Sequence, residues 1–214
     1  MEKKYEILEN DTIQVNGHKL LRIRALRNFW TVEKGQLGGY VESEENLSHN
    51  GNAWVFGDAK VFDHARVRDN AQVSGHASVF GNAWVFGNAK VFDHAMVRDN
   101  AQVSGDAYVF GDASVRGNAW VFGDARVFGK IMLRGQARVG HTKDFQAFGG
   151  LGREFFNLTA YRTIGGIELS TNEFQGSIEE FRKWSKKTYK NYPKLKRSFE
   201  LILEEIKVWF DLND

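Results

Sequence analysis

The chain has 214 residues and a formal net charge of +2, so no strong overall field selects a nucleic-acid or membrane partner. It contains no cysteine, which fits a reducing compartment and excludes disulfides and thiolate metal sites. The charged start predicts no secretory signal, and no apolar run reaches the roughly 18 residues of a membrane span. We therefore expect a cytoplasmic protein without a membrane partner.

Residues 1–46 are predicted to form an N-terminal β cap. Apolar and polar side chains alternate here, for example around Tyr5 and Ile7, as is typical of half-buried strands. Asn16-Gly17 is a strong signal for a tight hairpin turn between two such strands.

Residues 47–140 carry an internal repeat. Residues 53–82 recur at 83–112 with five of thirty positions changed (58/88, 66/96, 76/106, 78/108 and 82/112). Within this repeat, Ala recurs every six residues from Ala53 to Ala125, and Val follows two places after each Ala. A six-residue period with fixed small and branched residues predicts a β-solenoid in which three hexads close one coil.

The hexad A-x-V-x-[GD]-[NDH] assigns a place to each side chain. Ala and Val are two residues apart on a strand, so both point the same way, into the bore. The two following residues form the corner, because Gly, Asn and Asp tolerate positive φ. Stacked corners predict hydrogen-bonded ladders of the polar residues Asn70, Asn82, Asn88, Asn100 and Asn118.

Residues 141–214 are predicted to form a small α/β domain of two strands and two helices. Strands are expected at 154–162 and 167–174, joined by Gly165-Gly166. Ser177 and Glu180 form a capping box that opens a helix to about residue 187. Pro193 suits the first turn of a second helix, which runs to about residue 212.

The segments VFGNAW and VRDNAQ resemble hexapeptide-repeat proteins that fold as left-handed parallel β-helices. The resemblance implies a mainly β fold of that class, and the left-handed sense comes from the family. The segment LRIRALRNFWTVEKGQLGGYVESEENLSHNGNAWV, followed by the repeats and FQGSIEEF, resembles small hexapeptide-repeat, putative-transferase-like proteins of phages and prophages. This second resemblance implies a role inside a bacterial host cell.

Large aromatic side chains cannot share the narrow bore with Ala and Val, so we expect them to point outward. Contiguous exposed aromatics are unusual in monomers and mark interfaces. They would mediate self-association, pack against the terminal zones, or bind a foreign partner. The residues expected at an interface of a homodimer or homotrimer are Trp54, Phe56, Phe92, Tyr108, Phe110, Phe128, Phe199, Ile206 and Trp209.

Two groups of residues are candidates for binding a different molecule. Arg98, Arg116 and Arg134 fall in one column at coil spacing, where guanidinium groups could bind phosphates or carboxylates. A solvated face that discourages edge pairing is the other interpretation of this column. Trp84, Trp120 and Phe122 form a neighbouring aromatic face.

Many proteins of the resembled family are acyltransferases that use acyl-CoA and a histidine general base. The corresponding candidates are His64, His94 and His141, although the first two belong to the duplicated corner motif VFDHA. No long loop interrupts the hexads, and no metal-binding or phosphate-loop motif occurs. We therefore expect no metal and no cofactor, and acetyl-CoA or another acyl-CoA only if the chain is an acyltransferase.

The function expected from these observations is a non-enzymatic binding protein. Its partner would be a bacterial host protein or nucleoprotein complex, with an anionic nucleotide or nucleic acid as a possible ligand. Such a protein could inhibit a host defence system by occlusion or sequestration. An acyl-CoA-dependent acyltransferase and a self-assembling structural protein are the two alternatives.

Overall fold

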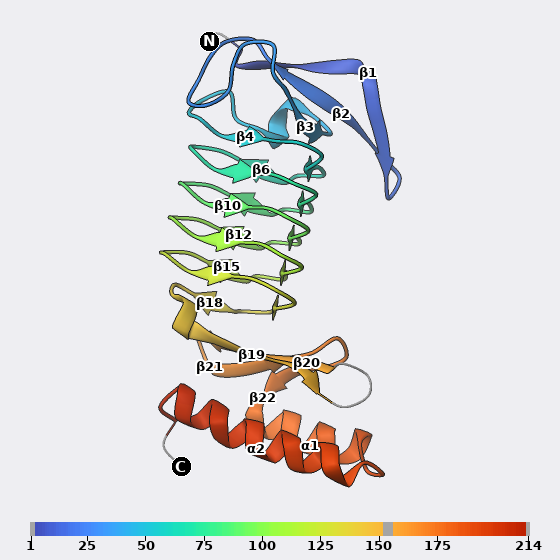
Figure 1. Ribbon diagram of the computed structural model, residues 1–214, viewed down its shortest axis with the longest axis vertical. Coiled ribbons are helices and arrows are strands. Elements are labelled where there is room, and N and C mark those ends of the chain that lie inside the picture. The colour runs from blue at the N-terminus through green and yellow to red at the C-terminus, as the bar shows by residue number, and fades with distance from the viewer. Residues whose placement is uncertain (1–2, 152–155, 213–214) are drawn as a thin grey trace.

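The computed structural model describes residues 3–151 and 156–212. From the N-terminal end downward, Figure 1 shows an antiparallel cap, a stack of coils, and a sheet underlain by two helices. The predicted fold class, mainly β with a parallel solenoid, an N-terminal hairpin and a C-terminal sheet with two helices, is confirmed. The left-handed sense of the coil stays a prediction.

The solenoid is built from fifteen two-residue strands, β4 to β18. Each strand pairs in parallel with the strand three places along, so Lys90 lies between Gln72 and Tyr108. Paired residues are 18 apart, which confirms that three hexads close one coil. The strands are β4 (Trp54–Val55), β5 (Lys60–Val61), β6 (Arg66–Val67), β7 (Gln72–Val73), β8 (Ser78–Val79), β9 (Trp84–Val85), β10 (Lys90–Val91), β11 (Met96–Val97), β12 (Gln102–Val103), β13 (Tyr108–Val109), β14 (Ser114–Val115), β15 (Trp120–Val121), β16 (Arg126–Val127), β17 (Met132–Leu133) and β18 (Arg138–Val139).

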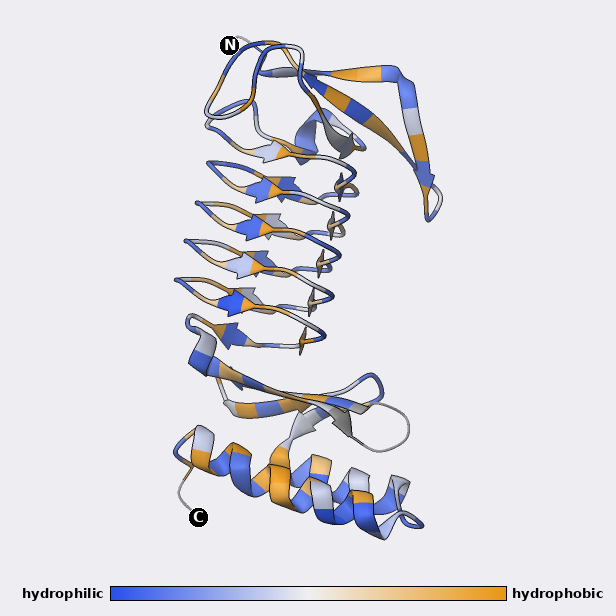
Figure 2. Cartoon of the chain, viewed as in Figure 1, coloured by the Kyte–Doolittle hydropathy of each residue, from blue (hydrophilic) through white to orange (hydrophobic). Residues whose placement is uncertain are grey.

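The bore holds the side chains that the hexad predicts. Every Ala from Ala53 to Ala125 and every Val from Val55 to Val127 at these positions is buried. Blue and orange alternate along each coil in Figure 2, because outward residues stand between the inward ones. The core of this part is therefore a thin column of small and branched side chains, and the large rings lie outside it.

The corners use positive φ and polar ladders, as predicted. Gly111 has a φ of 67° and Asp93 has 59° at equivalent places. The amide of Asn70 donates to Asn88 at 3.1 Å, and two further ladder bonds join Asn82 to Asn100 and Asn100 to Asn118. Asn88 donates in turn to Asp106 at 2.9 Å.

The N-terminal cap is a twisted hairpin joined to the first coil. Strands β1 (Tyr5–Val15) and β2 (His18–Ala25) meet at the predicted Asn16-Gly17 turn, where both residues have positive φ. β2 also pairs with β3 (Leu37–Val41), which pairs in parallel with β5 and so continues the solenoid sheet. A short 3-10 helix, η1 (Glu44–Asn46), follows.

Donors from the cap cover the carbonyl groups at the first coil. The ammonium of the fully buried Lys4 donates to the carbonyl of Ala53 at 2.7 Å, and Asn46 donates to two further carbonyls. Burial, with Arg27 nearby, lowers the pKa of Lys4 to about 8. The cap therefore satisfies backbone groups that the absence of a preceding coil would leave without partners.

The C-terminal part is a four-stranded antiparallel sheet with two helices beneath it. The strands are β19 (Phe145–Leu151), β20 (Phe156–Thr163), β21 (Gly166–Ser170) and β22 (Gln175–Ser177), preceded by a 3-10 helix, η2 (Thr142–Asp144). Helices α1 (Ile178–Thr188) and α2 (Pro193–Trp209) begin at the predicted capping box and proline. Their buried apolar residues pack in one cluster with Leu158, Ala160 and Leu169 of the sheet.

The strands of the C-terminal part differ from the prediction in two respects. The strand expected over 167–174 is broken after Ser170, because the Thr171 hydroxyl accepts hydrogen bonds from the backbone N–H of Glu173 and Phe174 and forms a turn. Two of the four strands, β19 and β22, were not predicted. The first two residues of the strand expected over 154–162 lie outside the described residues.

Candidate functional site

The arginine column consists of Arg98, Arg116 and Arg134, one from each of three successive coils. Strands β11, β14 and β17 place them in register, because Met96 pairs with Ser114 and Ser114 pairs with Met132. The backbone N–H of Arg98 donates to the carbonyl of Val115 at 3.0 Å, and the next coil repeats this bond. The guanidinium groups thus follow one another at the spacing of parallel strands, about 4.8 Å.

The arginine column is half-buried and lacks acidic partners. The Nε atoms of Arg98 and Arg134 are buried without a hydrogen-bond partner in the described part of the chain. Burial lowers the pKa of Arg116 and Arg134, and the neighbouring arginines lower it further. No ion pair found among the described residues involves the column; the paired arginines lie elsewhere. Positive charge is therefore concentrated here without an ion-pair partner among the described residues.

Acidic groups near the arginine column are engaged by other donors. Asp99 raises the pKa of Arg116, but its Oδ2 accepts a hydrogen bond from the backbone N–H of Gly117 at 3.0 Å. Glu168, in the sheet below, accepts a hydrogen bond from Gln175. Asp99 therefore reduces the local field at Arg116 without forming an ion pair with it.

An aromatic pair continues the column toward the cap. Phe80 occupies the hexad position of Arg98 one coil earlier, and its ring stacks on Phe62 at 4.9 Å and 4°. Phe62 is covered by Leu20 and Tyr40 of the cap, whereas Phe80 is half-buried. The same face therefore offers one partly exposed ring next to three guanidinium groups.

The aromatic face of Trp84, Trp120 and Phe122 is already engaged by residues of the solenoid. The guanidinium of Arg68 lies 4.2 Å from the ring centre of Trp84. Trp120 contacts Phe122 at 4.8 Å and donates its indole N–H to Ser104 at 2.9 Å. These contacts order the rings, and 36% of Trp120 remains exposed.

A phenylalanine ladder runs down another face. Phe92 stacks on Phe110 at 4.9 Å, and Phe110 stacks on Phe128 at 5.5 Å. Tyr108 lies beside it, between the cations of Lys90 and Arg126. Phe128 at the end of the ladder is 47% exposed.

The expected outward, interfacial position is wrong for three residues. Trp54 is fully buried because Tyr5 and Phe29 of the cap pack edge-on against its ring. Phe199 and Ile206 are buried in the C-terminal core. Two further interface candidates have partners within the chain: Phe56 packs against the solenoid core, and the Trp209 indole N–H donates to the carbonyl of Lys143 at 3.0 Å. Packing by the terminal zones accounts for the burial of Trp54, Phe199 and Ile206.

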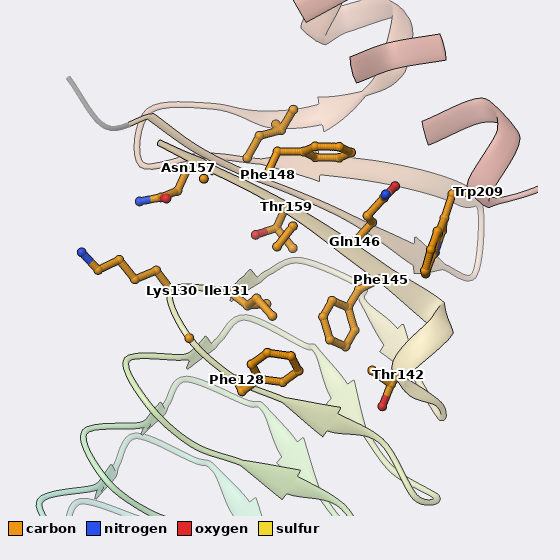
Figure 3. A pocket seen from close by; sticks show the side chains of 14 residues that line it. Phe128, Lys130, Ile131, Thr142, Phe145, Gln146, Phe148, Asn157, Thr159 and Trp209 are labelled. Atoms are coloured by element: carbon orange, nitrogen blue, oxygen red, sulfur yellow. The ribbon is translucent and has the colours of Figure 1, made fainter. Parts of the chain in front are cut away.

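The three candidate histidines lie apart from one another and outside the pocket at the C-terminal junction. His64 and His94 are exposed on the solenoid, and the ring of His94 stacks on His76 at 5.2 Å. His141 contacts the carboxylate of the exposed Asp124. The junction pocket has a volume of about 390 Å³ between the last coil and the C-terminal sheet (Figure 3), and no histidine lines it. None of these histidines therefore contributes to the junction pocket.

A histidine that sequence reasoning did not single out joins the cap to the solenoid. The Nδ1 of His18 lies 3.0 Å from Glu42, and its Nε2 lies 3.3 Å from Asp63. The hydrogen bond that the His18 ring donates to the Glu42 carboxylate raises the pKa of His18 and lowers the pKa of Glu42. Because the carboxylates contact opposite ring nitrogens, this group fits a protonated imidazole better than a metal ion, which one nitrogen would bind.

Comparison with models of known protein families finds no match, and comparison with curated proteins finds none either. Among the described residues, no helix is both long and apolar enough to cross a membrane.

Proposed function

We propose that the chain is a rigid binding scaffold that recognises a phosphate-bearing partner along the arginine column. The observation that supports this most directly is the stack of three half-buried guanidinium groups without an ion-pair partner among the described residues. Like charges that lie at strand spacing and are partly desolvated cost folding free energy. Such a cost is typical of residues that serve binding rather than stability. An anion bound there would relieve their mutual repulsion.

The chemistry of arginine and the spacing of the column define the partner. Guanidinium groups bind phosphate oxygens through two parallel hydrogen bonds, and the column spans roughly 10 Å from first to last. A single phosphate would engage one or two members, whereas a nucleotide with several phosphates or a nucleic-acid backbone would engage all three. The half-buried ring of Phe80 next to Arg98 provides a surface for a planar base.

The biological role that we propose follows from the resemblance to phage and prophage proteins. A phosphate-binding prism inside a bacterial cell would act on a host factor, such as a nucleoprotein complex of a defence system. It would do so by covering the nucleic-acid path or by sequestering a nucleotide. A rigid solenoid suits both actions, because a preformed array of donors loses little conformational entropy on binding.

The test is fluorescence anisotropy with a labelled single-stranded oligonucleotide, and competition with ATP and inorganic phosphate. We expect the oligonucleotide to bind, and ATP to compete more strongly than phosphate. Arg116→Glu should weaken binding by more than about tenfold without lowering the melting temperature, because it removes a repelling charge. Lys183→Glu, on the exposed side of α1, is the control with the same change of charge.

Three outcomes would contradict the proposal. The first is a wild-type chain that does not bind the oligonucleotide and is not affected by ATP. The second is an Arg116→Glu variant that binds the oligonucleotide as tightly as the wild type does. Stabilisation by acetyl-CoA that is lost in His64→Ala or His94→Ala would instead favour the acyltransferase. Affinity capture from a bacterial lysate, with mass spectrometry of proteins and nucleotides, would then identify the partner, and Arg116→Glu should fail to capture it.

A further inference from the structure

The end of the solenoid nearest the C-terminal sheet exposes a row of backbone donors. Inside the solenoid, such donors meet the next coil; for example, the N–H of Phe110 donates to Val127 at 2.9 Å. The last coil has no successor. Its N–H groups at Arg126 and Met132 are instead capped by the hydroxyls of Thr142 and Thr159, each at 3.2 Å.

Two N–H groups between these caps remain available. Phe128 and Lys130 occupy the same hexad positions as Phe92 and His94, whose N–H groups donate to the following coil. No hydrogen bond within the described residues reaches the N–H of Phe128 or Lys130. Gly129 between them has a φ of 68°, and successive N–H groups around a left-handed residue form a concavity that binds anions.

These two donors border the junction pocket of about 390 Å³. Its walls are mostly apolar and include Ile131, Phe145 and Phe148. Lys130 is the one residue with a charged side chain among those that line it, and Figure 3 shows this side chain on the same side of the pocket as Asn157. A pocket of this size, apolar with a few polar groups at one side, is typical of a small-molecule site. The pocket therefore combines an anion-binding rim and an apolar wall.

We propose that the junction pocket binds a small organic anion with an apolar body, such as an aliphatic or aromatic carboxylic acid. Its anionic group accepts hydrogen bonds from the N–H groups of Phe128 and Lys130 and pairs with the Lys130 ammonium. Its apolar body packs against Ile131, Phe145 and Phe148. This site is separate from the arginine column and does not depend on the function proposed for it.

The test uses 1-anilinonaphthalene-8-sulfonate, a fluorescent anion with apolar rings, and decanoate as its competitor. We expect saturable binding that decanoate displaces. Lys130→Glu should weaken it by about tenfold or more, because it replaces an attractive charge with a repulsive one. Ile131→Trp should abolish it by filling the pocket. Lys34→Glu, at the opposite end of the molecule, should bind like the wild type, and so should Arg116→Glu.

Melting curves for every variant show whether it is folded. Ile131 is buried, so its replacement could disturb the last coil, whereas Lys130 is exposed and its variant should melt like the wild type. A wild-type chain that does not bind the probe would overturn the proposal. So would a folded Lys130→Glu variant with unchanged affinity, or a folded Arg116→Glu variant that binds the probe more weakly than the wild type does.

Discussion

The carboxylate of Asp63 accepts a hydrogen bond from the backbone N–H of Gly81, the corner residue one coil later, at 3.0 Å. The pairs Asp69–Gly87, Asp93–Gly111 and Asp99–Gly117 repeat this bond at 3.0 to 3.1 Å. All four aspartates have positive φ, between 55° and 62°. Each of these corner aspartates therefore has a left-handed backbone conformation, and its side chain forms a hydrogen bond that joins two successive coils.

This relationship predicts an order of stability at Asp93. Asp93→Asn should remain close to the wild type, because Asn keeps an acceptor and tolerates positive φ. Asp93→Gly loses the hydrogen bond but no longer strains the backbone, so it should cost about 0.5–1.5 kcal/mol. Asp93→Ala suffers both effects and should cost about 1.5–3 kcal/mol. Urea unfolding measures the differences, and an alanine variant more stable than the glycine variant would contradict this account.

Trp54 and Trp120 occupy the same hexad position but should respond differently to replacement. Trp54 is fully buried beneath Tyr5 and Phe29, so Trp54→Ala should cost about 3–5 kcal/mol and loosen the cap. Trp120 is 36% exposed, so Trp120→Ala should cost no more than about 1–2 kcal/mol. The free energy of unfolding in urea is the measurement, and equal losses would show that the cap does not stabilise the first coil.

The contact of His18 with Glu42 and Asp63 predicts a pH optimum for attachment of the cap. The pKa of His18 is raised from 6.5, so its contribution is complete below pH 6.5 and is lost as pH rises through the raised value. The pKa of Glu42 is lowered from 4.5, so its contribution is complete above pH 4.5 and is lost as pH falls through the lowered value. Stability from this contact should therefore be greatest between pH 4.5 and 6.5.

Urea midpoints at pH values within and above this window measure the effect. His18→Gln should remove the part of the pH dependence that lies on the alkaline side, because the side chain no longer titrates. The exposed His94→Gln is the matched control and should retain that dependence. If the two variants have the same profile, the contact does not couple protonation to folding.

The phenylalanine ladder and Tyr108 predict self-association as a homodimer or homotrimer. Stacked, partly exposed rings on one face are typical of an interface, because their burial by a second copy removes apolar area from water. Light scattering should give the mass of two or three chains rather than 24.4 kDa. Phe110→Glu should yield the single-chain mass, and a wild-type mass of 24.4 kDa at all concentrations would exclude the prediction.

The hexad repeat, the hairpin turn and the helix starts could be predicted from the sequence, because each depends on residues within a few positions of one another. Asn16-Gly17 specifies a tight turn, and Ser177 with Glu180 specifies a helix start, through bonds within a few positions. Strand β19 escaped prediction because its residues, FQAFGGL, contain two glycines and lack a clear alternation. This strand is stabilised by its pairing with β20, and a contact between two segments produces no pattern within the residues of one of them.

The candidate sites divide in the same way. The spacing of Arg98, Arg116 and Arg134 in whole coils sufficed to predict their column. Their lack of ion-pair partners could not be predicted from the sequence. Asp99 is close in sequence to Arg98, but its carboxylate accepts a hydrogen bond from the backbone of Gly117 instead, and only the structure shows this choice. The junction pocket also left no pattern, since its lining comes from the last coil, β19, β20 and the end of α2.

The sequence by itself determined the solenoid. A hexad of Ala, Val and a corner residue has one way to bury its small side chains while it turns after each strand, so period and composition define the coil. Only the tertiary structure decided which outward residues remain exposed. Trp54 and Trp120 have the same place in the hexad, and the cap covers one while water reaches the other. The physical reason is that burial outside the bore depends on long-range packing of the terminal segments, which no repeat of six residues encodes.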